Sequence, residues 1–203
     1  MKLGIVPAGG VAFRFGGVMK ELLPIRDGET LLTRCVDAMS FCDATLVLTT
    51  PVKVQAHIEA LAPFQNIVFA MSMPTLWTSI KLALAIEADK YYFAMPDTMF
   101  PAETLREDLE EQLVFGVFNT YHPERFGVFV NGVICDKENV PGKAWGTLMW
   151  GWHVRNFWNA RNYQNHTDAL NDALRNFGYN IEQMDYYHDF ASMQDWKEWL
   201  TAH

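Results

Sequence analysis

The sequence predicts an α/β fold built on a mixed central β-sheet. Short apolar runs alternate with segments of helical periodicity through the first hundred residues, which is the pattern of parallel strands joined by helices. The second half contains several strand-like runs in succession, and one of them is interrupted by Asn131-Gly132, a dipeptide typical of tight hairpin turns. We therefore expect parallel strands first and an antiparallel-rich portion after them.

The first half supplies the alternating elements. The run "KLGIV" ends at a proline and two glycines, as a buried strand entering a loop does. In the segment 76–88, Leu76, Ile80, Leu84 and Ala88 recur at the spacing of one helix face. The expected elements, in chain order, are a strand over 2–6, a helix over 30–39, a strand over 45–50, a helix over 52–61, a strand over 66–70, a helix over 76–88 and a strand over 90–100.

The second half is less regular. A helix over 167–178 is indicated by an apolar face and by Gly178, which suits the residue after a helix C-terminus. A helix over 192–200 is indicated by a capping box of Ser192 and Asp195. The strands expected here cover 111–122, 126–136, 144–154 and 180–190.

Composition and charge exclude several classes of protein. The chain has 203 residues, of which 50% are hydrophobic, so it can bury a sizeable core in one domain. The net charge of −8 and the absence of a basic stripe argue against nucleic-acid binding. No run reaches the roughly 18 apolar residues of a membrane span, and the N-terminal apolar stretch is too short for a signal peptide. We therefore expect a cytoplasmic protein that binds neither membrane nor nucleic acid.

The cysteines and histidines indicate no metal centre of their own. Cys35, Cys42 and Cys135 form no CxxC pair, and a sparse odd set of this kind is typical of reduced core thiols. The six histidines show no ligand spacing for zinc, and no GxSxG nucleophile motif occurs.

The glycine-rich stretch "VPAGGVAFRFGGVMKELLPI" (6–25) is the first candidate for chemistry. Gly9 and Gly10 follow a strand, so their amides can approach an anion closely. Arg14 and Lys20 add cationic donors for phosphate oxygens. The spacing fits neither a Walker loop nor a GxGxxG loop. Taken alone, the stretch suits a phosphate-binding loop and a simple strand-to-helix turn about equally.

This stretch resembles the signature of the sugar-phosphate nucleotidylyltransferases, in a short single-domain form similar to glucose-1-phosphate thymidylyl- and uridylyltransferases. The resemblance implies that the loop around Ala8, Gly9 and Gly10 holds a nucleoside triphosphate. It also implies that Arg14 and Lys20 neutralise the phosphates and act as the catalytic cations, with the arginine stabilising the transition state.

The match departs from the family pattern at three positions of the loop. Ala12-Phe13 stands where the family usually has Gly-Thr, and Met19 stands where it has proline. Loss of the threonine removes one hydroxyl donor, so we expect altered phosphate contacts in this part of the loop.

Three further stretches resemble the same family in the same order. "FAMPDTMFP" resembles the strand that ends in an aspartate bound to Mg²⁺, which implies Asp97 as a metal ligand. "PERFGVFV" resembles the segment whose glycine contacts the sugar, which implies Gly127. "YHDFASMQDWKEWL" resembles the late segment that supplies the second metal ligand, which implies Asp189. The structural alternatives are a turn or cap aspartate at 97 and an ordinary loop aspartate at 189.

Weaker candidates lie between these stretches. By resemblance, Asp136 and Lys137 take the place of a glutamate and lysine that bind the sugar and its phosphate, with Lys143 as a rival for the lysine. A solvated hairpin charge cluster explains them about as well. "MPTLWTSIKLA" (73–83) lies where the family reads the base, which implies Pro74 and Trp77, although a core position is favoured for the tryptophan.

Four further tryptophans, Trp145, Trp150, Trp152 and Trp158, lie in the second half. Large aromatic side chains in such runs are more typical of a core or a subunit interface than of sugar stacking.

The resemblance implies a three-layer α/β/α, Rossmann-like fold of the nucleotide-diphospho-sugar transferase type with a mixed sheet. One domain would cover 1–203, with a nucleotide-binding half over 1–100 and a sugar-phosphate-binding half over 101–203. The implied reaction transfers a nucleoside monophosphate from the triphosphate to a sugar-1-phosphate, with Mg²⁺ as cofactor. The alternatives are a cytidylyltransferase acting on a non-sugar alcohol phosphate and a binding protein that has lost catalysis. The resemblance does not specify the base or the sugar, and it leaves open whether the chain forms a homo-oligomer.

Overall fold

The computed structural model describes residues 1–10, 15–26, 28–107 and 113–202. Within these ranges the chain forms a nine-stranded mixed sheet with the order β10-β9-β11-β6-β1-β4-β5, to which β8 is joined through β11 and β12 through β8. Two small ribbons lie outside the sheet: β2 (Pro24–Arg26) with β3 (Glu29–Thr30), and β7 with β13. The mixed α/β architecture predicted from the sequence is confirmed.

The first half builds the parallel part of the sheet. Its strands are β1 (Lys2–Pro7), β4 (Ala44–Thr49), β5 (Ile67–Met71) and β6 (Lys90–Ala94), with parallel pairing of β1 to β4 and β6, and of β4 to β5. The helices between them are α1 (Leu31–Asp37), α2 (Val54–Leu61) and α3 (Leu76–Leu84). Thr30 and Thr75 begin α1 and α3 with reciprocal capping boxes. Both helices end earlier than expected, at 37 rather than 39 and at 84 rather than 88.

The second half builds the antiparallel part. Its strands are β8 (Leu113–Asn119), β9 (Gly127–Val130), β10 (Val133–Asp136), β11 (Lys143–Gly151) and β12 (Asn180–Gln183), the last of which runs parallel to β8. The turn between β9 and β10 lies at Asn131-Gly132 as predicted, and both residues have positive φ. The helices are α4 (Trp152–Asn159), α5 (His166–Asn176) and α6 (Met193–Ala202).

Three expected strands were wrong in extent. The run 90–100 is divided at Pro96 into β6 and the short β7 (Thr98–Met99). The run 144–154 stops at Gly151, because α4 begins there and buries Val154 and Trp158 one helical turn apart. The run 180–190 contains β12 and, after a break, β13 (His188–Asp189), which pairs with β7 instead of entering the sheet.

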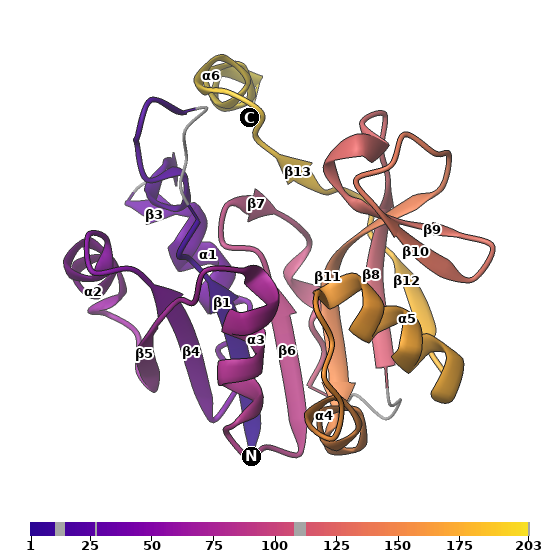
Figure 1. The fold of residues 1–203 in the computed structure, drawn as a ribbon. Helices are drawn as coiled ribbons and strands as arrows, with labels where there is room; N and C mark the ends of the chain where they lie inside the picture. The colour runs from indigo at the N-terminus through magenta and orange to yellow at the C-terminus, as the bar shows by residue number, and fades with distance from the viewer. Residues whose placement is uncertain (11–14, 27, 108–112, 203) are drawn as a thin grey trace.

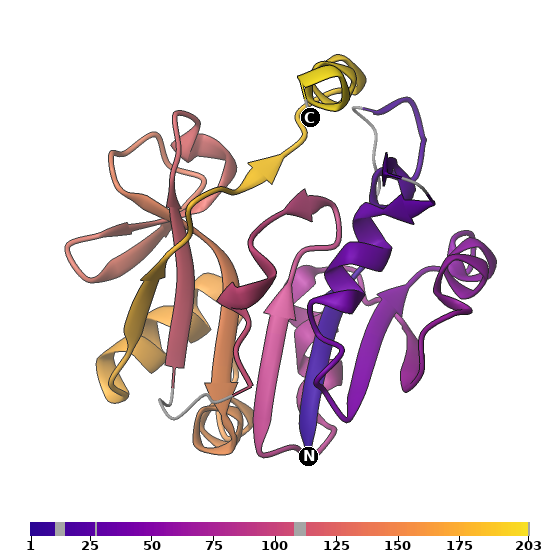
Figure 2. The same cartoon turned by 180° about the vertical axis from the view of Figure 1, so that it is seen from behind.

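Both faces of the parallel strands are buried, which explains their continuous apolar sequences. Along β1 and β4, Ile5 and Leu46 point into one core while Val6 and Val47 point into the other. Helices α3, α4 and α5 cover the first face, and α1 with part of α2 covers the second (Figures 1 and 2). The result is the three-layer arrangement that the resemblance implied.

A third cluster lies beyond the carboxyl ends of the parallel strands. There Phe190 and the partly buried Trp196 and Trp199 pack with Met99 and Leu31. The β7–β13 ribbon and α6 lie at this end of the molecule (Figure 1). None of the described helices combines the length and the apolar character needed to cross a bilayer.

Candidate active site

Two carboxylates and a lysine, far apart in the sequence, meet at the carboxyl end of the sheet. Asp97 follows β6, and Asp189 lies in β13, where it is the register partner of Thr98. The Lys20 ammonium donates to Asp97 Oδ2 at 3.2 Å and to Asp189 Oδ1. The β7–β13 ribbon therefore brings the two predicted metal ligands to one point. Open α/β sheets commonly bind their ligands at this end.

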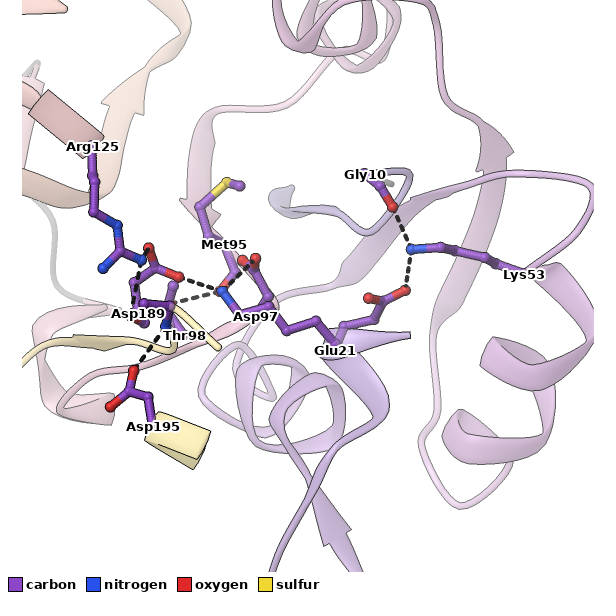
Figure 3. A network of polar contacts seen from close by, with 11 residues as sticks. Gly10, Glu21, Lys53, Met95, Asp97, Thr98, Arg125, Asp189 and Asp195 are labelled. Carbon is purple, nitrogen blue, oxygen red and sulfur yellow. Dashed lines mark hydrogen bonds and ion pairs between the residues drawn. The ribbon is translucent and has the colours of Figure 1, made fainter. Parts of the chain in front are cut away.

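A second cation, Arg125, completes this cluster. Its Nη2 donates to Asp189 Oδ2 and, at 3.1 Å, to the backbone carbonyl of Asp189 (Figure 3). The side chains of Lys20, Arg125 and Asp189 are 10%, 19% and 17% exposed, whereas Asp97 is 31% exposed. Two positive and two negative groups thus balance in a partly desolvated place. The sequence reasoning missed Arg125, although it stands in the "PERFG" stretch two residues before Gly127.

The strand that carries Asp189 is held by Tyr187. The Tyr187 ring stacks on Phe118 with a centroid separation of 4.1 Å, and a Cβ on Gly146 would lie 2.1 Å from the same ring. Only a glycine at 146 allows so close an approach. Burial raises the pKa of Tyr187, so its hydroxyl stays protonated. This packing fixes where β13, and with it Asp189, crosses the end of the sheet.

The residues after Asp189 are held by helix α6. Asp195 N–H donates to Ser192 Oγ at 3.2 Å, and the Asp195 carboxylate accepts from the Ala191 N–H at 2.8 Å. The predicted pair therefore does form at the helix start, but its carboxylate reaches the residue before Ser192. Figure 3 shows Asp195 below the Asp97–Asp189 cluster.

Of the first two glycines of the glycine-rich stretch, Gly9 and Gly10, packing explains only Gly9. A Cβ on Gly9 would lie 2.2 Å from Ser72 Oγ, so a larger residue would have to displace this neighbour. A Cβ on Gly10 would meet nothing within 4 Å. Ala8 is buried just beyond β1. Arg14 and the departures at Ala12 and Phe13 lie outside the described residues.

The sugar-side candidates are also brought together. Asp136 is the register partner of Gly127 in the β9–β10 hairpin, and Lys137 N–H donates to the Phe126 carbonyl at 2.9 Å. Lys143 lies at the start of β11, opposite Phe129 and Asn119. Gly127 has a packing reason of its own, because an added Cβ would lie 2.3 Å from the Trp145 indole nitrogen.

His166 is a neighbour of this hairpin that the sequence reasoning did not find. It is the first residue of α5, and its ring lies 6.4 Å from that of Trp145. Burial lowers the pKa of His166; Asp136 opposes this shift and Lys137 adds to it. The imidazole is therefore held neutral further into the acid range than a free histidine.

Of the two residues predicted to contact the base, only Pro74 is accessible. It is exposed in the loop before α3. Trp77 is 3% exposed, its indole N–H donates to the Tyr163 carbonyl at 3.1 Å, and its ring meets Trp158 edge to face. This burial corrects the stacking role implied for Trp77 and agrees with the core position. Trp150 and Trp158 are likewise buried.

Two of the three cysteines are core residues. Cys35 and Cys42 are buried, and Cys35 approaches the Ala94 carbonyl at the end of β6. Burial raises the pKa of both, that of Cys42 to about 12. Neither is a thiolate nucleophile near neutral pH.

Comparison with known proteins gives the family. The model of the MobA-like NTP transferase domain matches residues 4–126, which is more than half of the chain. The chain belongs to this family. As a MobA-like NTP transferase domain it is a nucleotidyltransferase, and its family binds a nucleoside triphosphate and a phosphate-bearing substrate. The nucleotidyltransferase family predicted by resemblance is thereby confirmed.

Three solved structures share the fold of this NTP transferase domain. A putative glucose-1-phosphate thymidylyltransferase from Bacillus anthracis, in complex with sucrose, superposes with a TM-score of 0.85 at 16% identity, covering 100% of this chain and 95% of that one. The inositol-1-phosphate CTP transferase from T. maritima gives 0.76 at 15% identity, covering 99% and 95%. A UDP-glucose pyrophosphorylase in complex with UDP-glucose gives 0.71 at 18% identity, covering 100% and 98%. A search of curated proteins gave no match.

Proposed function

We propose that this NTP transferase domain transfers a nucleoside monophosphate from a nucleoside triphosphate to a sugar-1-phosphate, releasing pyrophosphate and a nucleotide sugar. The observation that carries the proposal is the meeting of Asp97 and Asp189 at the Lys20 ammonium, beyond the carboxyl ends of β1 and β6. In this proposal the half over 1–100 binds the triphosphate and the half over 101–203 binds the sugar phosphate. The cluster belongs to both halves, because Asp189 reaches it from the second.

The chemistry needs little acid–base help from the protein. An anionic oxygen of the sugar-1-phosphate attacks the α-phosphorus and forms a new P–O bond. The bond from the α-phosphorus to the α,β-bridging oxygen breaks, and pyrophosphate leaves with that electron pair. Since the nucleophile is already ionised, the protein's task is to position two polyanions and to neutralise developing charge. Lys20 is placed for this at the cluster, and by resemblance Arg14 is its partner.

The two aspartates fit a magnesium ion. Mg²⁺ prefers hard oxygen ligands and is often held by one or two carboxylates together with substrate phosphates. Asp97 Oδ2 and Asp189 Oδ1 already flank one positive centre, the Lys20 ammonium, and Asp97 is the more exposed of the two. When bound, the ion would supply charge neutralisation at the phosphates. Lys20 would then exchange part of its contact with the aspartates for phosphate oxygens. Proteins of this family generally depend on a divalent metal.

The acceptor would lie against the β9–β10 hairpin. Gly127 presents its backbone there without a side chain, and the register pairing sets Asp136 beside it. In this proposal Asp136 accepts a hydroxyl of the sugar and Lys137 binds its phosphate. Lys137 is exposed, so its side chain is accessible to a phosphate. Pro74, exposed before α3, would contact the base.

A second candidate is a cytidylyltransferase that acts on a non-sugar alcohol phosphate. The inositol-1-phosphate CTP transferase shares the fold with a TM-score of 0.76, between the 0.85 of the putative glucose-1-phosphate thymidylyltransferase and the 0.71 of the UDP-glucose pyrophosphorylase, so this fold serves both kinds of acceptor. The same cluster would serve this reaction, with a different acceptor against the hairpin.

A substrate panel tests the proposal. Each of the common nucleoside triphosphates is combined with sugar-1-phosphates and with polyol phosphates, and pyrophosphate release is measured with Mg²⁺ and with excess EDTA. We expect release only with Mg²⁺ and with one of the sugar-1-phosphates. Release with polyol phosphates alone would support the cytidylyltransferase. Thermal stabilisation by a triphosphate without any release would indicate a binding protein.

A further inference from the structure

A buried ionic network lies directly beneath the glycine loop, apart from the Asp97–Asp189 cluster. Lys53 stands at the start of α2 and is 9% exposed. Its ammonium donates to the Gly10 carbonyl at 2.5 Å, to Glu21 Oε1 at 2.7 Å and to the Ala8 carbonyl at 3.4 Å. Figure 3 shows the side chain running from α2 to a point between Gly10 and Glu21.

Glu21 is itself fixed from a second side. It is 4% exposed, and its Oε1 also contacts His57 Nε2 at 2.9 Å, while His57 Nδ1 lies 2.8 Å from Thr49 Oγ1. Burial alone would raise the pKa of Glu21, but the hydrogen bonds from His57 and Lys53 outweigh it and lower the pKa. The carboxylate is therefore charged at neutral pH and forms a firm anchor for the ammonium.

The network joins two segments of the glycine-rich stretch that are separate in the sequence. Gly10 is the last described residue before 11–14, and Glu21 follows Lys20 directly in the short helix η2 (Lys20–Leu22). Lys53 thus links the end of the strand–loop segment to the turn that carries the proposed phosphate-binding cation. The Lys53 ammonium has three protons, and its contacts with the Gly10 carbonyl, the Ala8 carbonyl and Glu21 use all of them, so it is placed to support the loop.

We propose that Lys53, acting through Glu21, is a positioning residue that fixes the Gly10 backbone relative to Lys20, so that the loop amides and the Lys20 ammonium face the same polyphosphate. The proposal rests on the proposed function for the identity of the ligand. A buried ion pair often adds little net stability over apolar side chains of similar size, whereas it does impose one geometry on the two segments it joins. A purely structural role would appear in stability alone.

The double variant Glu21→Gln/Lys53→Met tests this. It leaves the net charge unchanged and leaves no buried charge without its partner. The glutamine side-chain oxygen can still accept a hydrogen bond from His57. Tripolyphosphate with Mg²⁺ is the probe, because it needs no knowledge of the base. We expect binding at least 10-fold weaker than in the wild type, measured by calorimetry, and faster amide hydrogen exchange over residues 8–10 and 15–23.

Two further variants complete the test. Lys53→Arg retains a charged donor for Glu21 and the Gly10 carbonyl, and we expect it to recover most of the affinity and the slow exchange. Should the double variant not fold, Glu21→Gln alone weakens the anchor, and we expect the same two changes at smaller size. Wild-type affinity and exchange in a folded variant that lacks the Lys53–Glu21 pair would overturn the proposal.

These readouts do not depend on turnover. If the wild type binds tripolyphosphate but releases no pyrophosphate with any substrate, the proposed function fails. The changes in binding and exchange would still decide the role of Lys53.

Discussion

The substitution Asp97→Asn separates catalysis from folding at the proposed site. In the structure Asp97 contacts the Lys20 ammonium at 3.2 Å, and its side chain is 31% exposed. Lys20 keeps its contact with Asp189 when this charge is removed. A partly exposed ion pair contributes about 0–1 kcal/mol. For a domain of this size that corresponds to a melting temperature lowered by at most about 4 °C, measured by circular dichroism or differential scanning fluorimetry.

The expected effect on activity is much larger. One charge-assisted contact is worth about 1.5–3 kcal/mol, which converts to a rate roughly 10- to 150-fold lower. Loss of a metal ligand would add to that figure. The assay is Mg²⁺-dependent pyrophosphate release at saturating substrates, followed with a coupled pyrophosphatase.

Asp172→Asn is the matched control. Asp172 lies on α5, accepts from Tyr163 Oη at 2.6 Å and belongs to no proposed site. We expect it to retain full turnover although it loses a comparable contact. Near-normal turnover of the folded Asp97→Asn variant would refute the assignment of Asp97. A loss of stability by many degrees would refute the account of its contacts.

Three other substitutions test separate parts of the account. Trp77→Phe removes the hydrogen bond to the Tyr163 carbonyl and some ring volume, so the free energy of unfolding should decrease by about 1–3 kcal/mol. The KM for the triphosphate should stay within twofold of the wild-type value. A large rise in that KM would indicate that Trp77 does stack on the base. Gly127→Ala should destabilise by about 1–3 kcal/mol through overpacking against Trp145, seen in urea denaturation, and wild-type stability would contradict the close approach. The pKa of His166 is lowered in the folded state, so the unfolded state takes up a proton first and the free energy of unfolding decreases as the pH falls below about 6.5. The melting temperature of His166→Gln should therefore fall less than that of the wild type between pH 7 and pH 5. Parallel curves of melting temperature against pH would contradict this.

The parallel half of the fold could be predicted from local sequence. Its strands are continuous apolar runs because both faces are buried, and each run is long enough to recognise. Asp97 was named through resemblance, and the continuous apolar run before it supported the assignment, because open α/β sheets bind ligands beyond the carboxyl ends of their strands. Asp189 was found only through resemblance, because β13 has two residues and no periodic pattern.

The residues and elements that sequence reasoning missed depend on contacts between distant parts of the chain. Lys53 looks in sequence like a solvated lysine at the start of a helix, and only the folded chain places it against Gly10 and Glu21. The first three residues of α4, 152–154, were read as the end of a strand because aromatic and β-branched residues also favour strands. Arg125 was overlooked because its partner, Asp189, comes 64 residues later in the chain.

The central claim is nucleotidyl transfer to a sugar phosphate, and isotope tracing tests it most directly. The sugar-1-phosphate that is active in the panel is prepared with ¹⁸O in its phosphate oxygens and incubated with the triphosphate and Mg²⁺, and the products are examined by mass spectrometry. Attack on the α-phosphorus predicts that all the label is retained in the nucleotide sugar and that the pyrophosphate is unlabelled. Labelled pyrophosphate, or hydrolysis of the triphosphate without a nucleotide sugar, would contradict the account.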